Sequence, residues 1–520
     1  MYYLGIHGEV GYGTHDTGLA IVNKDGNIFS LYTEERYSRV KHDWKFPKHC
    51  LMNLPNNKYK LTLGPEYSQQ IIPKLNENIS LAKIEKGFIY RHHISHACES
   101  FFTSGFSSAA SLVVDGVGTN NESITLGVFK NNQYDILKQY KIDNSLGVYY
   151  NDACNFAGFY SNNTFCSKEG NFMGLSAYGQ PYLNKLNKFS IEDGFQYKVK
   201  ETNKYFHTFY PYVHNHGENS LLHYANFAAT IQLDFDNAIL TLIQYLKDIT
   251  HETNICLSGG CFQNVITNNK ICESGIFENV WCSPCPHDGG VALGDVYYYL
   301  MLSGNNFNNN RMQHAYWGEE YPDEKILSYI DKEKYSLTYI TPQEVAKLLS
   351  EDKILAWFQD RSEYGPRALG HRSLIGNPGN RENFNILNNK IKHRENWRPL
   401  APSVPDELFD ILFDVKSKDL TQFMLRSIPI REEWRSRIPA VCHVDGTTRP
   451  QRLEREINPE YYDMIMEFYK LTELPCVINT SFNGPGEPII ENPKEALDFL
   501  NRTEDLYGVV FNGKYLVKRK

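Results

Sequence analysis

The apolar pattern along the chain alternates between short buried strands and longer helical stretches. Residues 94–106 are small and apolar without proline, which predicts a helix entered at His92, and residues 110–114 predict a buried strand that ends at Asp115. Residues 224–250 carry apolar side chains at spacings of three and four without Gly or Pro, so we expect one long helix packed on a sheet. This alternation predicts an α/β fold.

The order strand, glycine loop, strand, turn, strand occurs twice. It begins with YYLGIHG and the loop GEVGYGTHD, and it recurs from SLVVDGVG onward, with turns at Lys24-Asp25-Gly26 and at Asn131-Asn132. Two such modules, each presenting backbone N–H groups from a glycine loop, are suited to holding phosphates, and the pattern resembles the actin-like and sugar-kinase-like ATPases. The alternative is two unrelated glycine-rich hairpins in an α/β protein.

The length of 520 residues predicts at least two domains. Residues 303–340 are polar and broken by Gly and Pro, which favours a connection, so we predict domains at 1–340 and 341–520. The second begins with the amphipathic helix TPQEVAKLLSEDK and the strand ILAWFQD, and it ends with a hairpin that turns at Asn512-Gly513.

Composition and charge narrow the class of protein. Hydrophobic residues at 41% and charged residues at 22% are typical of a globular protein, and the net charge of -8 gives no electrostatic case for nucleic acid or an anionic membrane as partner. The N-terminus lacks the pattern of a signal peptide and no apolar run is long enough to span a bilayer, so we expect a cytoplasmic protein. The 11 cysteines then predict reduced thiols, and the lone pair Cys282 and Cys285 is interpreted as structural.

Two histidines and two aspartates form a candidate metal site. A helix puts His92 and His96 on one face, roughly 5–6 Å apart at Cβ, and Asp115 can add an oxygen from the end of a strand. Asp288 follows another strand and can complete a His2Asp2 set. The alternatives are histidines satisfied in the core or at the surface, and Asp288 as an ordinary helix N-cap.

Glycine and arginine loops provide two candidate anion sites. Gly259 and Gly260 end a buried strand before a helix, where backbone can approach an anion or a nucleotide. In the second domain, arginine and lysine recur on loops rich in Gly and Pro and are accompanied by polar residues at the end of a strand. These residues are Arg367, Arg372, Lys390, Lys392, Arg394, Arg398, Ser481 and Asn483. Guanidinium groups bind phosphate bidentately, so we favour an anion pocket over a solvated basic face.

Eight motifs in order, spread over nearly the whole chain, resemble the O-carbamoyltransferases that modify antibiotics and nodulation factors. They are HHISHA, VVDGVG, EGNFMGLSAYG, LSGGCFQN, PHDGGVALG, EYGPRALGHRSLIGNP, HRENWRPLAPSV and NTSFNGPGEPII. The resemblance implies an N-terminal domain similar to the tRNA threonylcarbamoyl-transfer protein, which has the actin-like ATPase fold, and an α+β C-terminal domain similar to the YrdC fold.

The resemblance also implies two half-reactions. In the C-terminal domain carbamoyl phosphate and ATP, the latter with Mg, give carbamoyl adenylate and pyrophosphate. In the N-terminal domain the carbamoyl group passes to a hydroxyl of a sugar-like small molecule, and AMP is released. His15 is implied as the general base for that hydroxyl, and a ring that only orients the loop or contacts substrate is the alternative.

The resemblance assigns the remaining site residues by motif. The metal, normally iron(II), is implied at His92, His96, Asp115 and Asp288. The nucleotide of the N-terminal domain is implied at Gly116, Gly118, Gly259, Gly260, Asn264, Arg39 and Lys41. Carbamoyl phosphate and ATP are implied at Arg367, Arg372, Lys392, Arg398, Ser481 and Asn483.

The chain departs from the family pattern at two places. Asn171 follows Glu169 and Gly170 where many members have lysine, and Ser258 stands where alanine is usual; the first leaves the identity of the acceptor open. Residues 160–225 are expected to shape the acceptor pocket, where the aromatic and histidine side chains can serve packing or sugar contacts: His207, Tyr210, Tyr212, His214 and His216.

Two other functions are compatible with parts of the sequence. One is tRNA threonylcarbamoyl transfer, against which the acidic net charge and the fusion of both domains speak. The other is a non-catalytic actin-like nucleotide-binding protein, which leaves the C-terminal arginine motifs unexplained. The hydrogenase-maturation relatives carry paired CxxC motifs that are missing from this chain. The sequence does not determine the oligomeric state, and a homodimer is compatible with it.

Overall fold

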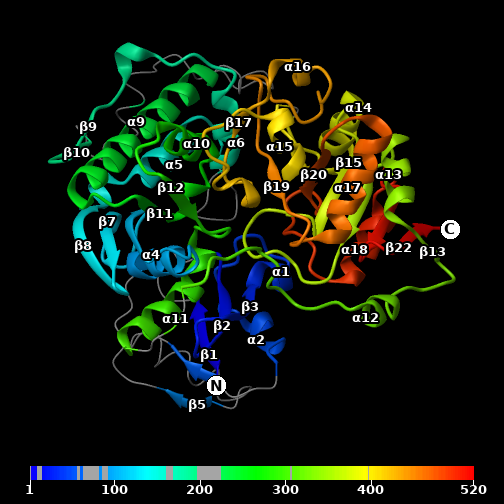
Figure 1. Ribbon diagram of the computed structural model, residues 1–520, viewed down its shortest axis with the longest axis horizontal. Helices are drawn as coiled ribbons and strands as arrows, with labels where there is room; N and C mark the ends of the chain where they lie inside the picture. The colour runs from blue at the N-terminus through cyan, green and yellow to red at the C-terminus, as the bar shows by residue number, and fades with distance from the viewer. Residues whose placement is uncertain are drawn as a thin grey trace. The chain divides into compact units, whose positions relative to one another are not determined.

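The computed structural model falls into two compact units (Figure 1). It describes residues 2–8, 15–55, 59–62, 81–84, 92–159, 168–195, 206, 224–304, 307, 309–395 and 397–520. Unit 1 comprises Met1–Glu34 and His42–Met312, and unit 2 comprises Glu35–Lys41 and Gln313–Lys520. The predicted boundary at residue 340 therefore falls inside unit 2. The reason is that the polar stretch before it supplies β13 (Tyr335–Tyr339), which pairs with the last strand, β22 (Tyr515–Arg519).

Unit 1 contains two five-stranded sheets of the same topology, with the orders β3-β2-β1-β4-β5 and β8-β7-β6-β11-β12. The strands of the first are β1 (Tyr2–His7), β2 (Gly18–Asn23), β3 (Ile28–Thr33), β4 (Tyr59–Leu61) and β5 (Leu81–Ile84). Those of the second are β6 (Ser108–Val114), β7 (Glu122–Lys130), β8 (Gln133–Lys141), β11 (Asn254–Ser258) and β12 (Asn279–Cys282).

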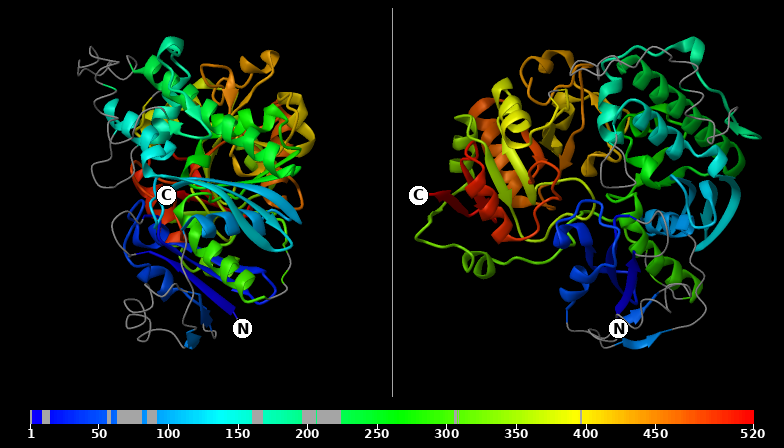
Figure 2. Two further views of the ribbon diagram at one scale, coloured as in Figure 1. Left: turned by 90° about the vertical axis from the view of Figure 1, so that its left-hand side faces the viewer. Right: turned by 180° about the vertical axis from the view of Figure 1, so that it is seen from behind.

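The strand directions of the two sheets also correspond. In each sheet the first three strands are antiparallel neighbours, and the fourth and fifth run parallel to the first. The hairpin of β7 and β8 forms the edge of the second sheet (Figure 2). The internal repeat predicted from the sequence is thus confirmed, and it gives the duplicated α/β architecture of the actin-like ATPase fold.

Two helices join the sheets of unit 1. α4 (His92–Phe102) packs on β6 and β11, α11 (Val291–Leu302) packs on β1 and β2, and the two helices pack on each other. Their approach requires Gly294, since a Cβ there would meet the carbonyl oxygen of Ser95 at 1.9 Å. This close contact fixes how the first residues of α4 and the first residues of α11 lie relative to each other.

The predicted long helix at 224–250 is confirmed, and it is one of four further helices with eight or more residues in the described part of unit 1. They are α5 (Leu146–Phe156), α6 (Glu169–Ser176), α9 (Ala225–Thr250) and α10 (Val265–Ser274). The long helix α9, green in Figure 1, packs on β6, α5, α6 and α10. α4 ends before the predicted residue 106 because Gly105 adopts φ +78°, a conformation that a helix cannot include.

Unit 2 is built on one eight-stranded mixed sheet in the order β13-β22-β21-β14-β15-β20-β16-β19. Its remaining strands are β14 (Leu355–Phe358), β15 (Arg372–Gly376), β16 (Ala401–Pro405), β19 (Gln451–Leu453), β20 (Val477–Ser481) and β21 (Gly508–Phe511). The predicted hairpin at Asn512-Gly513 is confirmed by the antiparallel pairing of β21 with β22.

Helices cover both faces of this sheet, as the alternation of side chains along β14 shows. Leu355 and Trp357 pack with α13 (Pro342–Ser350) and α17 (Pro459–Thr472). Ala356 and Phe358 face the opposite layer, which contains α14 (Arg381–Asn385), α15 (Asp406–Leu412) and α18 (Pro493–Arg502). Because every residue of β14 is buried, this strand lies at the centre of an α+β unit.

The described residues also bear on two predictions from composition. Every cysteine among them is a free thiol, as predicted for a reduced protein. Within the same part of the chain, no helix combines the length and the apolar character needed to cross a membrane.

Candidate functional site

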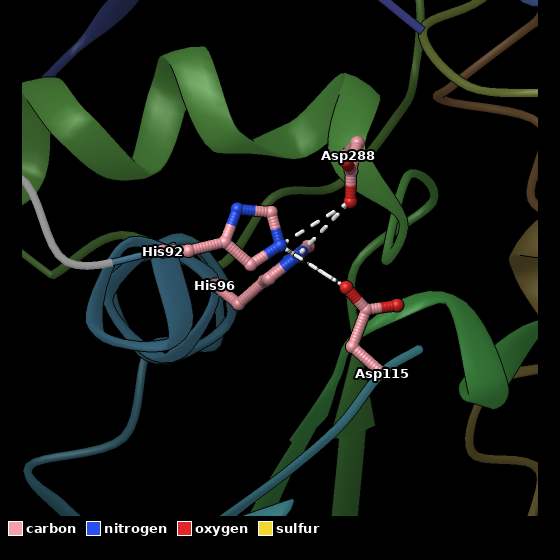
Figure 3. Close-up of side chains that lie close together, drawn as sticks. All are labelled: His92, His96, Asp115 and Asp288. Atoms are coloured by element: carbon pink, nitrogen blue, oxygen red, sulfur yellow. Dashed lines mark hydrogen bonds and ion pairs between the residues drawn. The ribbon is translucent and has the colours of Figure 1, made fainter. Parts of the chain in front are cut away.

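The four residues predicted as metal ligands lie together in unit 1 (Figure 3). One ligand atom from each of His92, His96, Asp115 and Asp288 lies within 4.8 Å of all the others. The Nε2 atoms of His92 and His96 are 3.1 Å apart. Asp115 Oδ2 lies 3.0 Å from His92 Nε2, and Asp288 Oδ1 lies 3.4 Å and 3.5 Å from the two imidazole nitrogens.

Regular elements position each of these side chains. His92 and His96 occupy the first turn of α4, four residues apart, so both rings project from one face of the helix (Figure 3). Asp115 directly follows β6, and its Oδ1 accepts a hydrogen bond of 3.1 Å from the N–H of Gly260. Asp288 lies in the turn before α11, where His287, and not Asp288, caps the turn by accepting from Gly289 N–H. Asp288 is therefore left to face the histidines.

Electrostatics favours the charged forms in this cluster. Burial alone would suppress the charge on His92, but the carboxylates of Asp288 and Asp115 outweigh it and raise the pKa of His92 to about 10. Burial likewise opposes ionisation of the two aspartates. Hydrogen bonds from His92 and His96 at Asp115, and the charges of His15 and His92 at Asp288, nevertheless hold the pKa of both carboxyl groups well below the ordinary value.

The donor set fits a divalent metal ion. Two imidazole nitrogens face each other and two carboxylate oxygens, and Asp288 Oδ1 is buried without a hydrogen-bond donor among the described residues. An unsatisfied buried carboxylate oxygen is costly in a protein interior, and a cation at this point would remove the cost. Nitrogen and oxygen ligands in this ratio suit first-row metals such as Fe, Mn or Zn.

His15 lies beside the metal ligands and is held by its neighbour in the chain. Its Nδ1 lies 2.9 Å from Asp16 Oδ2, and its Nε2 lies 4.0 Å from Asp288 Oδ2. Asp16 is buried and also contacts His42 Nδ1 at 2.8 Å and His287 Nδ1 at 3.2 Å. Despite its burial, the neighbouring imidazoles, His42 foremost, hold the pKa of Asp16 well below its usual value. An ionised Asp16 accepting from Nδ1 leaves Nε2 of His15 as the atom that can take a proton.

Sequence reasoning missed Asp16 and His7 as members of this site. His7 is buried at the end of β1, its Nε2 lies 3.7 Å from Asp288 Oδ2, and burial lowers its pKa. The internal repeat contained the signal for His7. The strand β1 corresponds to β6, so the His7-Gly8 pair occupies the place that Asp115-Gly116 occupies in the second module.

The glycines predicted to bind nucleotide surround the same strand ends. Gly259 adopts φ +95°, and a Cβ there would meet Val114 O at 2.2 Å, so the residue allows close approach of the backbone. Among the described residues, no atom lies within 4 Å of the place that a Cβ at Gly116 would take, whereas a Cβ at Gly118 would meet the carboxylate of Glu122. Gly116 is therefore open on its Cβ side within this part of the chain, and Gly118 is packed.

Asn264 has a local structural role. It is the N-cap of α10, accepts from Thr267 N–H at 3.2 Å, and exchanges two side-chain hydrogen bonds with Gln232. Its side chain therefore fixes the turn that carries Gly259 and Gly260.

Arg39 and Lys41, predicted with the nucleotide residues of the N-terminal domain, belong to unit 2 instead. The guanidinium of Arg39 donates to the carbonyl oxygens of Ile489 and Pro488 at 2.8 Å and 2.9 Å and pairs with Glu495 at 3.2 Å. These contacts anchor the segment. The charge of Lys41 acts on Lys392, which is part of the basic cluster described next.

Lys392, Ser481 and Asn483 come together in unit 2. The buried Lys392 ammonium donates to the carbonyl oxygen of Ser481, to Ser481 Oγ at 3.1 Å and to Asn483 Oδ1 at 2.8 Å. Burial, reinforced by Arg394, Arg398 and Lys41, holds the pKa of Lys392 well below its usual value. The positive charges in this region therefore outnumber the negative ones.

Four guanidinium groups lie in the same region as Lys392, and we call these four the arginine cluster. They are Arg367, Arg394, Arg398 and Arg449. Burial and the charge of Arg398 lower the pKa of Arg367 to about 10 and that of Arg394 to about 9. Burial and the charges of the other three lower the pKa of Arg449 well below its usual value. Within the described residues, Nε of Arg367 and of Arg449 is buried without an acceptor.

The four side chains are only partly buried, and like charges gathered in one place favour an anion that compensates them. The arginine cluster is therefore a candidate site for phosphate groups. Arg449 was not predicted, since it stands alone between Thr448 and Pro450 in no recognisable motif.

Arg372 does not have the exposed donors that a ligand would need. It is fully buried, and its guanidinium donates to the carbonyl oxygens of Gln359, Asp360, His371 and Glu491. The group also lies over the ring of Phe358 at 3.6 Å. The side chain holds the core of unit 2 together, and the ligand role that the resemblance implies is not supported by this geometry.

The predicted acceptor region is described only in part. His207, Tyr210, Tyr212, His214 and His216 lie outside the described residues. Glu169, in the motif that departs from the family pattern, begins α6 and accepts a hydrogen bond from Asn151 Nδ2 at 2.9 Å. Asn171, in the same motif, is buried.

Comparison with known proteins adds family matches to this geometry. Residues 49–296 match the family model described as Carbamoyltransferase N-terminus, and residues 346–519 match the one described as Carbamoyltransferase C-terminus. An uncharacterized protein of Synechocystis sp. is 30% identical over 96% of this chain and 94% of its own length. The nodulation protein NolNO of Sinorhizobium fredii is 29% identical over 97% of this chain and 79% of its own.

One solved structure aligns with part of this chain. Full-length HypF in its phosphate- and nucleotide-bound form aligns with a TM-score of 0.34 and 13% identity over 59% of this chain and 56% of its own.

Proposed function

The chain belongs to the carbamoyltransferase family and is a carbamoyltransferase, and from this premise we propose that it is an ATP-dependent O-carbamoyltransferase. In the first half-reaction, carbamoyl phosphate and ATP give carbamoyl adenylate in unit 2. In the second, the carbamoyl group passes to a hydroxyl of a sugar-like small molecule in unit 1. The observation that carries the proposal is the arginine cluster, because four partly buried guanidinium groups gathered near Lys392 favour a polyanionic substrate.

The first half-reaction uses this excess of positive charge. For the atoms to balance, water releases phosphate from carbamoyl phosphate and leaves carbamate, whose oxygen then attacks the α-phosphorus of ATP as pyrophosphate leaves. Guanidinium groups neutralise the charge that grows on both leaving groups, and Mg accompanies ATP. Lys392, fixed on Ser481 and Asn483, adds a cation at a defined point, and Lys41 adds another near it.

The second half-reaction uses the residues around the metal site. His92, His96, Asp115 and Asp288 would hold a divalent ion, which the family resemblance implies to be iron(II), and such an ion would supply Lewis-acid polarisation of an acyl group. His15 takes the proton of the acceptor hydroxyl at Nε2, and Asp16 holds the opposite ring nitrogen and stabilises the imidazolium that forms. The carbamoyl carbon is then attacked by the hydroxyl oxygen, and AMP leaves.

Mass spectrometry tests the intermediate that links the half-reactions. Purified protein is given ATP, Mg and isotopically labelled carbamoyl phosphate without any acceptor, and the quenched mixture is searched for an adenylate that carries the label. The proposal predicts labelled carbamoyl adenylate in the wild type and none with Arg367→Met. A wild type that consumes carbamoyl phosphate without ever forming a labelled adenylate would rule the proposed route out.

A further inference from the structure

A short segment from the first part of the chain completes unit 2. Residues Glu35–Lys41 belong to unit 2, although the residues on either side of them, Glu34 and His42, belong to unit 1. The segment contains Arg36, which is one of the largest fully buried side chains of the protein, with only 2% of its surface exposed. Burial of a guanidinium is costly, so its partners show what the segment stabilises.

Arg36 holds the loop that leads to Arg367. One of its terminal nitrogens, Nη2, donates to the carbonyl oxygens of Glu363 at 3.2 Å and of Gly365 at 3.1 Å. Gly365 has φ +94°, so the chain turns sharply here, two residues before Arg367. The charged guanidinium thus fixes the turn by binding two of its carbonyl groups.

Glu363 fixes the same loop from the side of its N–H groups. Its Oε1 accepts from the backbone N–H groups of Leu369, His371 and Arg372 at 2.7 Å, 2.9 Å and 3.0 Å. Glu363 and Arg36 together define the conformation of residues 363–372. Arg367 is the side chain of this loop that belongs to the arginine cluster, and its Nε is buried without an acceptor among the described residues.

We propose that Arg36 is a positioning residue for the anion site of unit 2: by holding the carbonyl groups of Glu363 and Gly365, it fixes the loop that presents Arg367 to a phosphate group. The inference rests on the proposed function in so far as that phosphate belongs to a substrate. It assigns residues 35–41, which lie outside the stretch that matches the C-terminal family model, to the working form of that site.

A second arginine offers a matched control for a purely structural effect. Arg519 donates to the carbonyl oxygens of Leu500, Thr503, Glu504 and Leu506, so it also holds a turn of unit 2 through its guanidinium. The turn that it holds carries none of the arginine cluster. Loss of Arg519 should therefore lower the unfolding temperature without changing anion affinity.

Isothermal titration calorimetry of the full chain with inorganic pyrophosphate tests the inference. We expect Arg36→Met to raise the Kd by at least about tenfold, and Arg519→Met to leave the Kd unchanged. Because Arg36 acts through Arg367, the double variant Arg36→Met/Arg367→Met should bind no more weakly than Arg367→Met alone. If Arg36→Met does not fold, Arg36→Lys replaces it. A lysine keeps the charge but lacks the planar fork, and its Kd should still rise severalfold.

The outcomes separate this inference from the proposed function. Equal pyrophosphate affinity in the wild type and the folded Arg36 variant would overturn the inference, and so would strictly additive effects of Arg36→Met and Arg367→Met. A wild type that binds no pyrophosphate would overturn it as well, since there would be no anion site to position. A wild type that binds pyrophosphate but never forms carbamoyl adenylate would refute only the proposed function.

Discussion

The Nε2 atoms of His92 and His96 lie 3.1 Å apart and face the carboxylates of Asp115 and Asp288. Two ring nitrogens do not approach each other in this way without a shared proton or a shared cation. The pair therefore marks this part of unit 1 as the candidate metal site.

Metal content should follow this geometry. We expect His96→Ala to lose most of the bound metal, measured by elemental analysis after dialysis, because the remaining ligands leave one corner of the site open. His93→Ala is the control: His93 is equally buried on α4 but contacts Thr125 Oγ1 at 2.8 Å. Equal metal loss in both variants would show that the helix, and not the ligand set, determines metal binding.

Arg367 and Arg372 should respond in opposite ways to the same substitution. Arg372→Met leaves several buried carbonyl groups without a donor, so we expect a loss of roughly 3–5 kcal/mol in the free energy of unfolding of unit 2. Arg367→Met removes one of several like charges, so the protein without anion should be equally or more stable. Urea unfolding of both variants checks this, and a ligand role for Arg372 would be indicated if it proved dispensable for stability.

Arg449 should be needed for the chemistry of unit 2. Removal of one preorganised cation from a site of developing charge lowers turnover by roughly 10²–10³-fold, and we expect this loss in the rate of pyrophosphate release by Arg449→Met. Arg455 pairs with Asp463 on the surface, so Arg455→Met should retain the wild-type rate. Wild-type turnover in Arg449→Met would remove this residue from the site.

Glu99 should make unit 1 less stable as the pH rises. Burial raises its pKa from 4.5 to about 8, so above pH 4.5 the unfolded chain loses a proton that the folded chain still holds. Stability from this group is complete below the unfolded pKa and falls by up to about 1.4 kcal/mol per pH unit until the folded pKa is reached.

Glu99→Gln tests this, because glutamine is neutral at every pH. The urea midpoint of the variant should exceed that of the wild type by an amount that grows between pH 5 and pH 8. The exposed Glu433→Gln should show no such trend. A constant difference across this range would mean that Glu99 is ionised in the folded protein.

The metal ligands could be predicted from sequence because each lies at the end of a regular element. His92 and His96 share a helical face whatever surrounds them, and Asp115 and Asp288 follow strands whose parallel pairing with β11 brings their ends together. The duplicated sheet was predictable for the same reason, since its period-two strands and glycine turns repeat along the chain.

The arginines of unit 2 were less predictable, because tertiary burial decides their roles. Arg367 and Arg372 share one loop and one pattern of neighbours in the sequence. Arg367 nevertheless belongs to the arginine cluster, whereas the guanidinium of Arg372 donates to backbone carbonyl groups. Arg36 lies in the five-residue helix α1 (Glu34–Ser38) and Arg449 in no helix or strand, and both are far from that loop in sequence.

Pyrophosphate release from ATP, measured with and without carbamoyl phosphate, is the sharpest test of the first half-reaction in unit 2. We expect release that depends on carbamoyl phosphate, disappears in Arg367→Ala and largely survives in His92→Ala, since the candidate metal site serves the second half-reaction. Release that is indifferent to carbamoyl phosphate would contradict the account and favour a protein that only binds nucleotide.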